Sequence, residues 1–252
     1  MIERLVIGQC FPRIEQEHLK RYEFATGYVA GKDVLDIACG SGYGSAMLAD
    51  AGAKSVTGVD LSPEAVESAT ANFGRGNVRF AVGDIQRLTD IPDASFDLIA
   101  SFETIEHVPD DQLALRELRR VLRPGAGGVL VVPAGPATYD YYDRFLGHER
   151  RYARGEMAAK ALGAGLEVIE DLHLGSVLYP PFWLVKQRNR RRYGHLQGEA
   201  LEARVAADIA GTRDSRIGSL ACSLEAAMLA RGVRLPFGIR GLTVVRRPRD
   251  QR

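Results

Sequence analysis

Short apolar runs alternate with segments of helical character along the first half of the chain. The runs predict strands at residues 33–38, 55–60, 78–82, 96–101 and 128–132. The segments between them predict helices at 43–51, from 62 onward and at 110–122. Runs without polar alternation are typical of parallel strands buried on both faces. Together with the strand–helix alternation they predict a doubly wound α/β sheet with right-handed crossovers.

The pattern changes after Pro133. Residues 134–155 are rich in Tyr, Arg and Gly and predict a substrate loop over the carboxyl edge of the sheet. Beyond this loop we expect a helix at 155–162, a strand at 166–174, a long insertion at 175–236 with helices at 199–209 and 217–231, and a last strand at 241–247. The chain is thus predicted to form a single domain, residues 1–252, whose helical insertion acts as a cap or a dimerisation surface.

The N-terminal segment carries its own helical signal. Apolar and aromatic residues recur among charged ones over residues 14–30, which is typical of an amphipathic helix. We expect residues 1–30 to form a helical lid. The first residues lack the basic-then-apolar pattern of a secretory signal.

Composition narrows the function classes. Of the 252 residues, 46% are hydrophobic, which excludes a wholly disordered chain. The 33 basic residues are nearly balanced by 32 acidic ones, which disfavours a protein that coats nucleic acid. No apolar run approaches the length of a membrane-spanning helix. Three cysteines without metal-type spacing favour a reduced, cytoplasmic protein. We therefore expect no nucleic-acid partner and no transmembrane segment.

The most informative motif is the glycine-rich stretch from Asp36 to Gly44, which follows the first strand. Glycines there let a ligand approach the backbone, and such a strand-to-helix turn is the usual nucleotide site of an open α/β sheet. The G-x-G-x-G spacing lacks the third glycine of a dinucleotide site, and Asp36 suits a ligand with a cationic amine. Asp60 and Asp84 end the next two strands, and Ser101 ends the fourth.

Residues 14–135 resemble the class I S-adenosylmethionine-dependent methyltransferases. The resemblance runs through VLDIACGSGYGS, VTGVDLSPEAVE, NVRFAVGDIQRL, FDLIASFETIEHV and LRELRRVLRPGAGGVLVV. It implies a seven-stranded, mostly parallel, Rossmann-like sheet whose last strand is antiparallel. It also implies that Gly40 and Gly42 line the methionine part of S-adenosylmethionine, that Asp60 binds the ribose, and that Asp84 and Ile85 hold the adenine. The places of Asp36, Leu61 and Ser101 at the strand ends make them further candidates for cofactor binding, and Tyr22 of the lid is expected to cover the methionine part.

Glu103, Glu106 and His107 lie at the mouth of this predicted cleft. They resemble the E-x-x-E-H pattern of the ubiquinone-biosynthesis O-methyltransferases, whose members use a divalent ion there. Two carboxylates and an imidazole can bind Mg²⁺ together with water or substrate oxygens. Glu103 and His107 are then also candidates for catalysis. The alternative is that these side chains only stabilise the turn through hydrogen bonds.

The predicted substrate loop offers a candidate general base. His148 could take a hydroxyl proton, because an imidazole titrates near working pH. Tyr142, Arg151 and Tyr152 are candidates for holding a polar substrate. The alternative is that His148 and Tyr152 only hold the loop in place.

The preferred function is an O-methyltransferase acting on a hydroxyl of a saccharide or related small molecule, with metal assistance. A quinone or polyprenyl phenol acceptor is the second choice, supported by E-x-x-E-H and by the apolar segment 174–185. That segment and the arginines after it could pack a homodimer or touch a membrane surface. An RNA methyltransferase, a nicotinamide dehydrogenase and a non-catalytic S-adenosylmethionine-binding protein are the alternatives from other classes.

Overall fold

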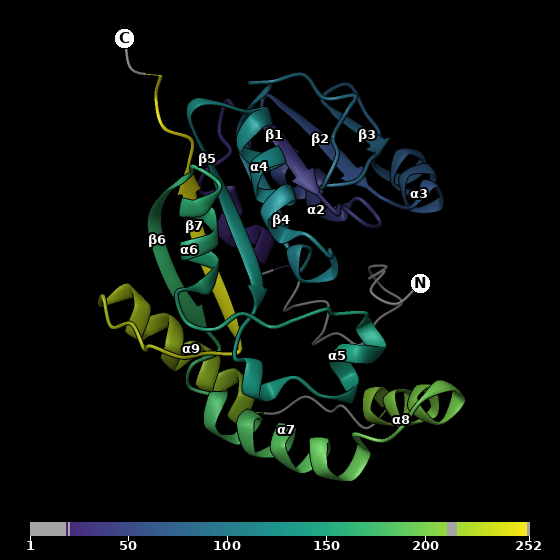
Figure 1. Cartoon of the computed structure of the whole chain (residues 1–252). Coiled ribbons are helices and arrows are strands. Elements are labelled where there is room, and N and C mark those ends of the chain that lie inside the picture. Colours follow the sequence, from purple (N-terminus) through teal and green to yellow (C-terminus); the bar gives the residue numbers. More distant parts are fainter. Residues whose placement is uncertain (1–18, 20, 211–215, 251–252) are drawn as a thin grey trace.

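The apolar runs pair into one seven-stranded sheet in the computed structural model, which describes residues 19, 21–210 and 216–250 (Figure 1). The strands are β1 Asp33–Ile37, β2 Ser55–Asp60, β3 Val78–Val82, β4 Phe96–Phe102, β5 Leu122–Pro133, β6 Glu167–Leu174 and β7 Arg240–Arg246. Their order is β3-β2-β1-β4-β5-β7-β6, and only β7 runs antiparallel to its neighbours. The predicted doubly wound, mostly parallel sheet is confirmed, with its switch point between β1 and β4.

All the helices that the sequence predicts after residue 42 are present, close to their expected bounds, and α5 and α7 are additional. The helices are α2 Tyr43–Asp50, α3 Pro63–Phe73, α4 Asp111–Val121, α5 Tyr141–Leu146, α6 Glu156–Gly163, α7 Tyr179–Tyr193, α8 Gly198–Ala210 and α9 Arg216–Ala230, with the 3-10 turns η1 Ile105–His107 and η2 Pro136–Thr138. Helix α3 starts as expected: the Ser62 hydroxyl accepts a hydrogen bond from the Ala65 N–H at 3.3 Å, and Pro63 occupies the first helical position.

Two apolar clusters fill the two faces of the sheet. Leu35 and Leu118 belong to the face covered by α4 and α6, whereas Val34 and Leu48 belong to the face covered by α2 and the N-terminal residues. Neighbouring residues of β1 therefore point to opposite cores. This explains why its sequence is apolar without alternation.

The fifth strand is longer than the predicted 128–132. Leu122 directly follows α4 and pairs with Phe96, whereas the next pair joins Gly127 to Leu98, so the residues between form an irregular bulge. Pro124 lies in this bulge, where the ladder needs no N–H from it. The strand therefore begins directly after α4, earlier than the sequence predicts.

Residues 134–155 are not the long loop that the sequence predicts, because η2 and α5 lie within them. Helix α5 starts with a capping box: the Asp140 side chain accepts from the start of the helix, and the Asp143 side chain accepts from the Asp140 N–H at 2.9 Å. Two acidic residues three positions apart are the signal that sequence reading missed.

The insertion contains one helix more than predicted, since α7 precedes α8 and α9 (Figure 1). Helix α7 lies beyond the carboxyl end of β5, next to η2 and α5. No helix within the described residues is long and apolar enough to cross a membrane. The N-terminal helix is shorter than predicted at its carboxyl end, because residues 27 and 28 form a turn; residues 1–18 and 20 of the expected lid lie outside the described residues.

Candidate cofactor and acceptor site

The carboxyl ends of β1 and β2 are joined through Asp60. Its two carboxylate oxygens accept hydrogen bonds from the Gly40 N–H and the Ser62 N–H, both at 2.9 Å. The side chain thereby links the glycine loop to the start of α3. Leu61 follows Asp60 at the surface and is 70% exposed. Its side chain therefore offers apolar surface to an aromatic ring of a bound ligand.

The glycine loop has the backbone geometry that a close ligand requires. Gly40 and Gly42 have φ values of +54° and +86°, which side-chain-bearing residues rarely adopt. A Cβ on Gly42 would lie 2.7 Å from the Ala69 side chain, whereas a Cβ on Gly40 would meet no described atom within 4 Å. Gly42 is therefore required by packing, and Gly40 faces open space.

Asp36 is fully buried at the end of β1. It accepts hydrogen bonds from the Tyr22 hydroxyl at 3.1 Å and from the Ser45 hydroxyl at 2.6 Å. Burial raises the pKa of the Asp36 carboxyl to about 7, although the two hydroxyl donors lower it. A cationic group placed beside Asp36 would favour the ionised form.

Tyr22, in the described part of the N-terminal segment, packs directly on the glycine loop. Its ring packs edge-on against Phe102, with centroids 4.9 Å apart, and a Cβ on Gly44 would lie 2.0 Å from that ring. The sequence prediction put Tyr22 over the methionine part of the cofactor, and the structure places it beside Asp36 at this end of the cleft. Ser101 is also buried here, and its hydroxyl has no hydrogen-bond partner within the described part of the chain.

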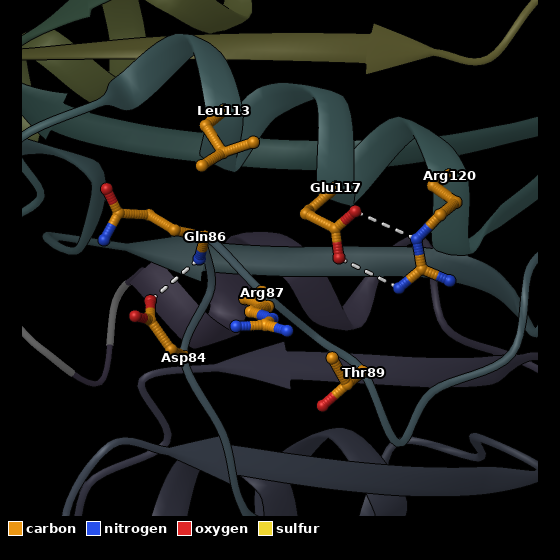
Figure 2. A pocket seen from close by; sticks show the side chains of 7 residues that line it. All are labelled: Asp84, Gln86, Arg87, Thr89, Leu113, Glu117 and Arg120. Carbon is orange, nitrogen blue, oxygen red and sulfur yellow. Dashed lines mark hydrogen bonds and ion pairs between the residues drawn. The ribbon is translucent and has the colours of Figure 1, made fainter.

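Asp84 and Ile85 follow β3. The Asp84 carboxylate accepts from the Gln86 N–H at 2.8 Å, and Ile85 is buried. Beside them lies a hollow of about 560 Å³ lined by residues of the 84–89 segment and of α4: Asp84, Gln86, Arg87, Thr89, Leu113, Glu117 and Arg120 (Figure 2). Of the predicted cofactor residues, only Asp84 lines this hollow. The hollow is therefore distinct from the predicted cleft.

The three expected Mg²⁺ ligands do not come together. The Glu103 carboxylate accepts from Arg240 Nε at 3.0 Å and lies 3.9 Å from an Arg21 nitrogen. Glu106 and His107 instead group with His148, with one ligand atom of each within 4.8 Å of the others. One carboxylate and two imidazoles do not suit Mg²⁺, which prefers oxygen ligands. The expected magnesium site is therefore not supported.

His148 is held by a carboxylate. Its Nδ1 lies 2.9 Å from Asp143 Oδ1, and its Nε2 lies 4.0 Å from Glu106 Oε1. The side chain is only 2% exposed, and the half-buried His107 packs edge-on against it with ring centroids 4.8 Å apart. His107 Nδ1 in turn lies 3.2 Å from the Gly147 carbonyl.

The predicted substrate residues differ in their surroundings. Tyr152 is buried, and its hydroxyl donates to Asp111 at 3.1 Å, so the hydroxyl is engaged in the core. Arg151 Nε donates to Asp143 at 2.6 Å. Tyr142 is half-buried, and its ring lies 5.7 Å from the Lys186 ammonium. Sequence reading missed Asp143 and Lys186, which hold this region together.

Comparisons with known proteins agree with the geometry. Residues 35–132 match the model of a methyltransferase domain family. The ubiquinone biosynthesis O-methyltransferase of Xanthomonas euvesicatoria is 32% identical over 65% of this chain and 71% of its own length. The 2-methyl-6-phytyl-1,4-hydroquinone methyltransferase of Synechocystis is 42% identical over 40% of this chain, which spans only 31% of that enzyme.

Solved structures agree on the fold. A chain from the complex of the Haloferax volcanii Trm112 methyltransferase activator with a methyltransferase superposes with a TM-score of 0.64 at 22% identity, covering 95% of this chain and 93% of that one. The strand order, the glycine loop and the relatives agree on one conclusion. The chain belongs to the class I S-adenosylmethionine-dependent methyltransferases.

Proposed function

We propose that the protein transfers the methyl group of S-adenosylmethionine to a hydroxyl of a saccharide or related small molecule. The observation that carries the choice of a hydroxyl acceptor is the His148–Asp143 pair beside the carboxyl ends of β4 and β5. A histidine held by a carboxylate is suited to removing a hydroxyl proton. The saccharide class is supported by the run of hydrogen-bonding side chains at residues 139–144.

The proposed reaction is an in-line displacement in which the acceptor oxygen attacks the methyl carbon and the sulfur leaves. The protein's main task is then to align oxygen, carbon and sulfur. His148 Nε2 accepts the hydroxyl proton, and Asp143 stabilises the imidazolium that forms. The His148 side chain is only 2% exposed and His107 packs edge-on against it, so the acceptor must reach His148 past neighbouring side chains.

A quinone or polyprenyl phenol is the second candidate acceptor. The Xanthomonas and Synechocystis relatives carry quinone-related names. In addition, α7 exposes Trp183, Leu184 and Val185, and its exposed Arg188, Arg191 and Arg192 follow them. Such a helix could contact a lipid surface where polyprenyl compounds reside. Incubation with labelled cofactor and a panel of sugars and phenols decides between the two classes.

Replacing Asp60 with alanine should weaken cofactor binding. We expect a loss on the order of 1.5–3 kcal/mol, the range for hydrogen bonds to a charged group, because ribose hydroxyls would lose their acceptor. Calorimetry with S-adenosylhomocysteine measures it. The exposed Asp90 is the matched control, and its alanine variant should bind normally. Equal affinity in wild type and Asp60→Ala would refute the cofactor assignment.

Mg²⁺ should not affect turnover. The donor set of Glu106, His107 and His148 does not suit Mg²⁺, and Glu103 is occupied by Arg240. We therefore expect that adding Mg²⁺ to EDTA-treated protein does not change the rate once the acceptor is known. A loss that added Mg²⁺ restores would instead support the metal-assisted form of the reaction.

The insertion is proposed to form a homodimer surface. Exposed apolar side chains occur on α7 and α9, including Leu184 at 63% and Leu220 at 70% exposure. We expect size-exclusion chromatography with light scattering to give a dimer, and Leu184→Glu to shift it to a monomer. A wild-type monomer whose Trp183 fluorescence is quenched by solutes in water would contradict this proposal.

A further inference from the structure

Asp143 is the centre of a buried charge cluster that links three parts of the chain. Its carboxylate is inaccessible to solvent, and its Oδ1 accepts from His148 Nδ1 and from Arg151 Nε. Its Oδ2 accepts from the Asp140 N–H at 2.9 Å and lies 3.5 Å from the Lys186 ammonium. These donors hold the pKa of the Asp143 carboxyl well below its usual range despite burial.

An ionised Asp143 determines which nitrogen of His148 carries the proton. A carboxylate can only accept hydrogen bonds, so the 2.9 Å contact requires a proton on Nδ1. In the neutral imidazole the Nε2 atom then has the lone pair, and it lies 4.0 Å from Glu106 Oε1. The contact therefore prepares His148 to accept a proton at Nε2.

Lys186 connects this cluster to the helical insertion. It is the one buried residue of α7, a helix that is described over its whole length, and its ammonium donates to Asp140 Oδ1 at 2.7 Å. It also lies 5.4 Å from the centre of the Phe182 ring and 5.7 Å from that of Tyr142. Lysine is rarely buried unless it is paired. Helix α7 is thus attached to α5 through a buried cation, in addition to the ring contact between Tyr193 and Tyr141, whose centroids are 5.5 Å apart.

The remaining contacts of α7 with this region are also polar or aromatic. Gln187 and Arg190 both donate to the Ala137 carbonyl, at 2.6 and 2.9 Å, and the Arg151 guanidinium lies 5.7 Å from the Phe182 ring centre. Within the cluster, the negative charges of Asp140 and Asp143 are balanced by the positive charges of Lys186 and Arg151. Removing the lysine leaves the carboxylates with one buried cation fewer, which disturbs the hydrogen bond to His148.

We propose that Asp143 and Lys186 are positioning residues for methyl transfer: Asp143 fixes the tautomer and orientation of His148, and Lys186 of the insertion holds Asp143. The insertion is then part of the acceptor site as well as a surface for partners. The inference rests on the proposed function, in which His148 is the base. It adds that the base depends on a residue 38 positions further along the chain.

The test measures the His148 tautomer directly, without substrate. Two-bond ¹H–¹⁵N correlation spectra report which imidazole nitrogen is protonated, and the His148 signals are identified by their loss in His148→Gln. We expect the Nδ1–H form in wild type, a shift toward Nε2–H in Asp143→Asn, and a partial shift in Lys186→Met. Lys186→Arg should keep the wild-type form. Arg188→Met, an exposed neighbour on α7, is the matched control.

Turnover is measured on the same variants. Asp143→Asn should lower kcat on the order of 10²–10⁴-fold, as expected for a wrong tautomer, and Lys186→Met roughly 10–100-fold, as expected for a misplaced group, with cofactor affinity unchanged. A wild-type Nε2–H form, or an Asp143→Asn variant with wild-type kcat, overturns the inference and leaves the methyltransferase assignment intact. If Asp143→Asn does not fold, the wild-type and Lys186 spectra decide. If the tautomer shifts in these variants but the protein methylates no hydroxyl, the positioning roles are supported and the proposed function is refuted.

Discussion

Replacing His148 with alanine lowers kcat on the order of 10²–10⁴-fold, the usual contribution of a general base. The reason is that Nε2 is the atom proposed to take the acceptor proton, with Asp143 2.9 Å from Nδ1 to stabilise the charge that forms. Affinity for S-adenosylmethionine should be unchanged, because the predicted cofactor residues lie at the ends of other strands. Single-turnover kinetics together with calorimetry separates the two effects.

The variant His148→Gln separates catalysis from stability. Its side-chain amide can still donate to Asp143 but cannot accept a proton as a base, so turnover should fall as in the alanine variant while the free energy of unfolding stays closer to wild type. The exposed His195 serves as the control, and its alanine variant should keep full activity. Wild-type kcat in His148→Gln would reduce His148 to a residue that holds the loop in place.

Replacing Asp36 with asparagine flattens the pH dependence of stability. Burial raises the pKa of the Asp36 carboxyl to about 7 in the folded protein, whereas an unfolded aspartate has a pKa of about 3.9. Between these values the folded state binds the proton that the unfolded state has released, so this group's contribution to stability falls as pH rises from about 4 to 7. The change is on the order of 4 kcal/mol, at about 1.4 kcal/mol per pH unit.

Urea denaturation of both proteins from pH 4 to pH 8 measures this effect. Other carboxylates contribute to both curves, so the difference between wild type and Asp36→Asn isolates the buried group. That difference should change steadily up to about pH 7 and then level off. Asp90→Asn, at an exposed position, should give the wild-type curve. Parallel curves for wild type and Asp36→Asn would mean that Asp36 is already ionised in the folded protein.

The sheet could be predicted because its signals are local. Buried parallel strands require continuous apolar runs, and the glycines at 40 and 42 are required by backbone angles at one turn. The start of the fifth strand and the whole of α5 were missed because their local sequence signals are weak. Residues 122–127 carry no strand signal unless their pairing with β4 is known, and the cap of α5 uses Asp143 in place of the more common Glu or Gln.

The acceptor side of the site depended on contacts that sequence spacing does not encode. Glu103 lies within three residues of Glu106, and the sequence grouped them as ligands of one ion. In the structure, the backbone of Glu103 has a φ of +50°, and its side chain binds Arg240, which lies 137 positions away. Glu106 instead lies close to His148, which belongs to the connection that follows the next strand, β5.

The sequence by itself determined the sheet, the glycine loop and the carboxylates at the strand ends, because each depends on a residue and its immediate neighbours. Only the tertiary structure decided which charged groups pair with one another. Buried charges must find an opposite charge or a hydrogen-bond donor wherever the fold brings one close. Asp143 finds His148, Arg151 and Lys186, and only the last of these comes from the insertion. In the candidate acceptor site, the long-range pairs Asp143–Lys186 and Glu103–Arg240 are therefore decided by the tertiary structure around a locally encoded fold.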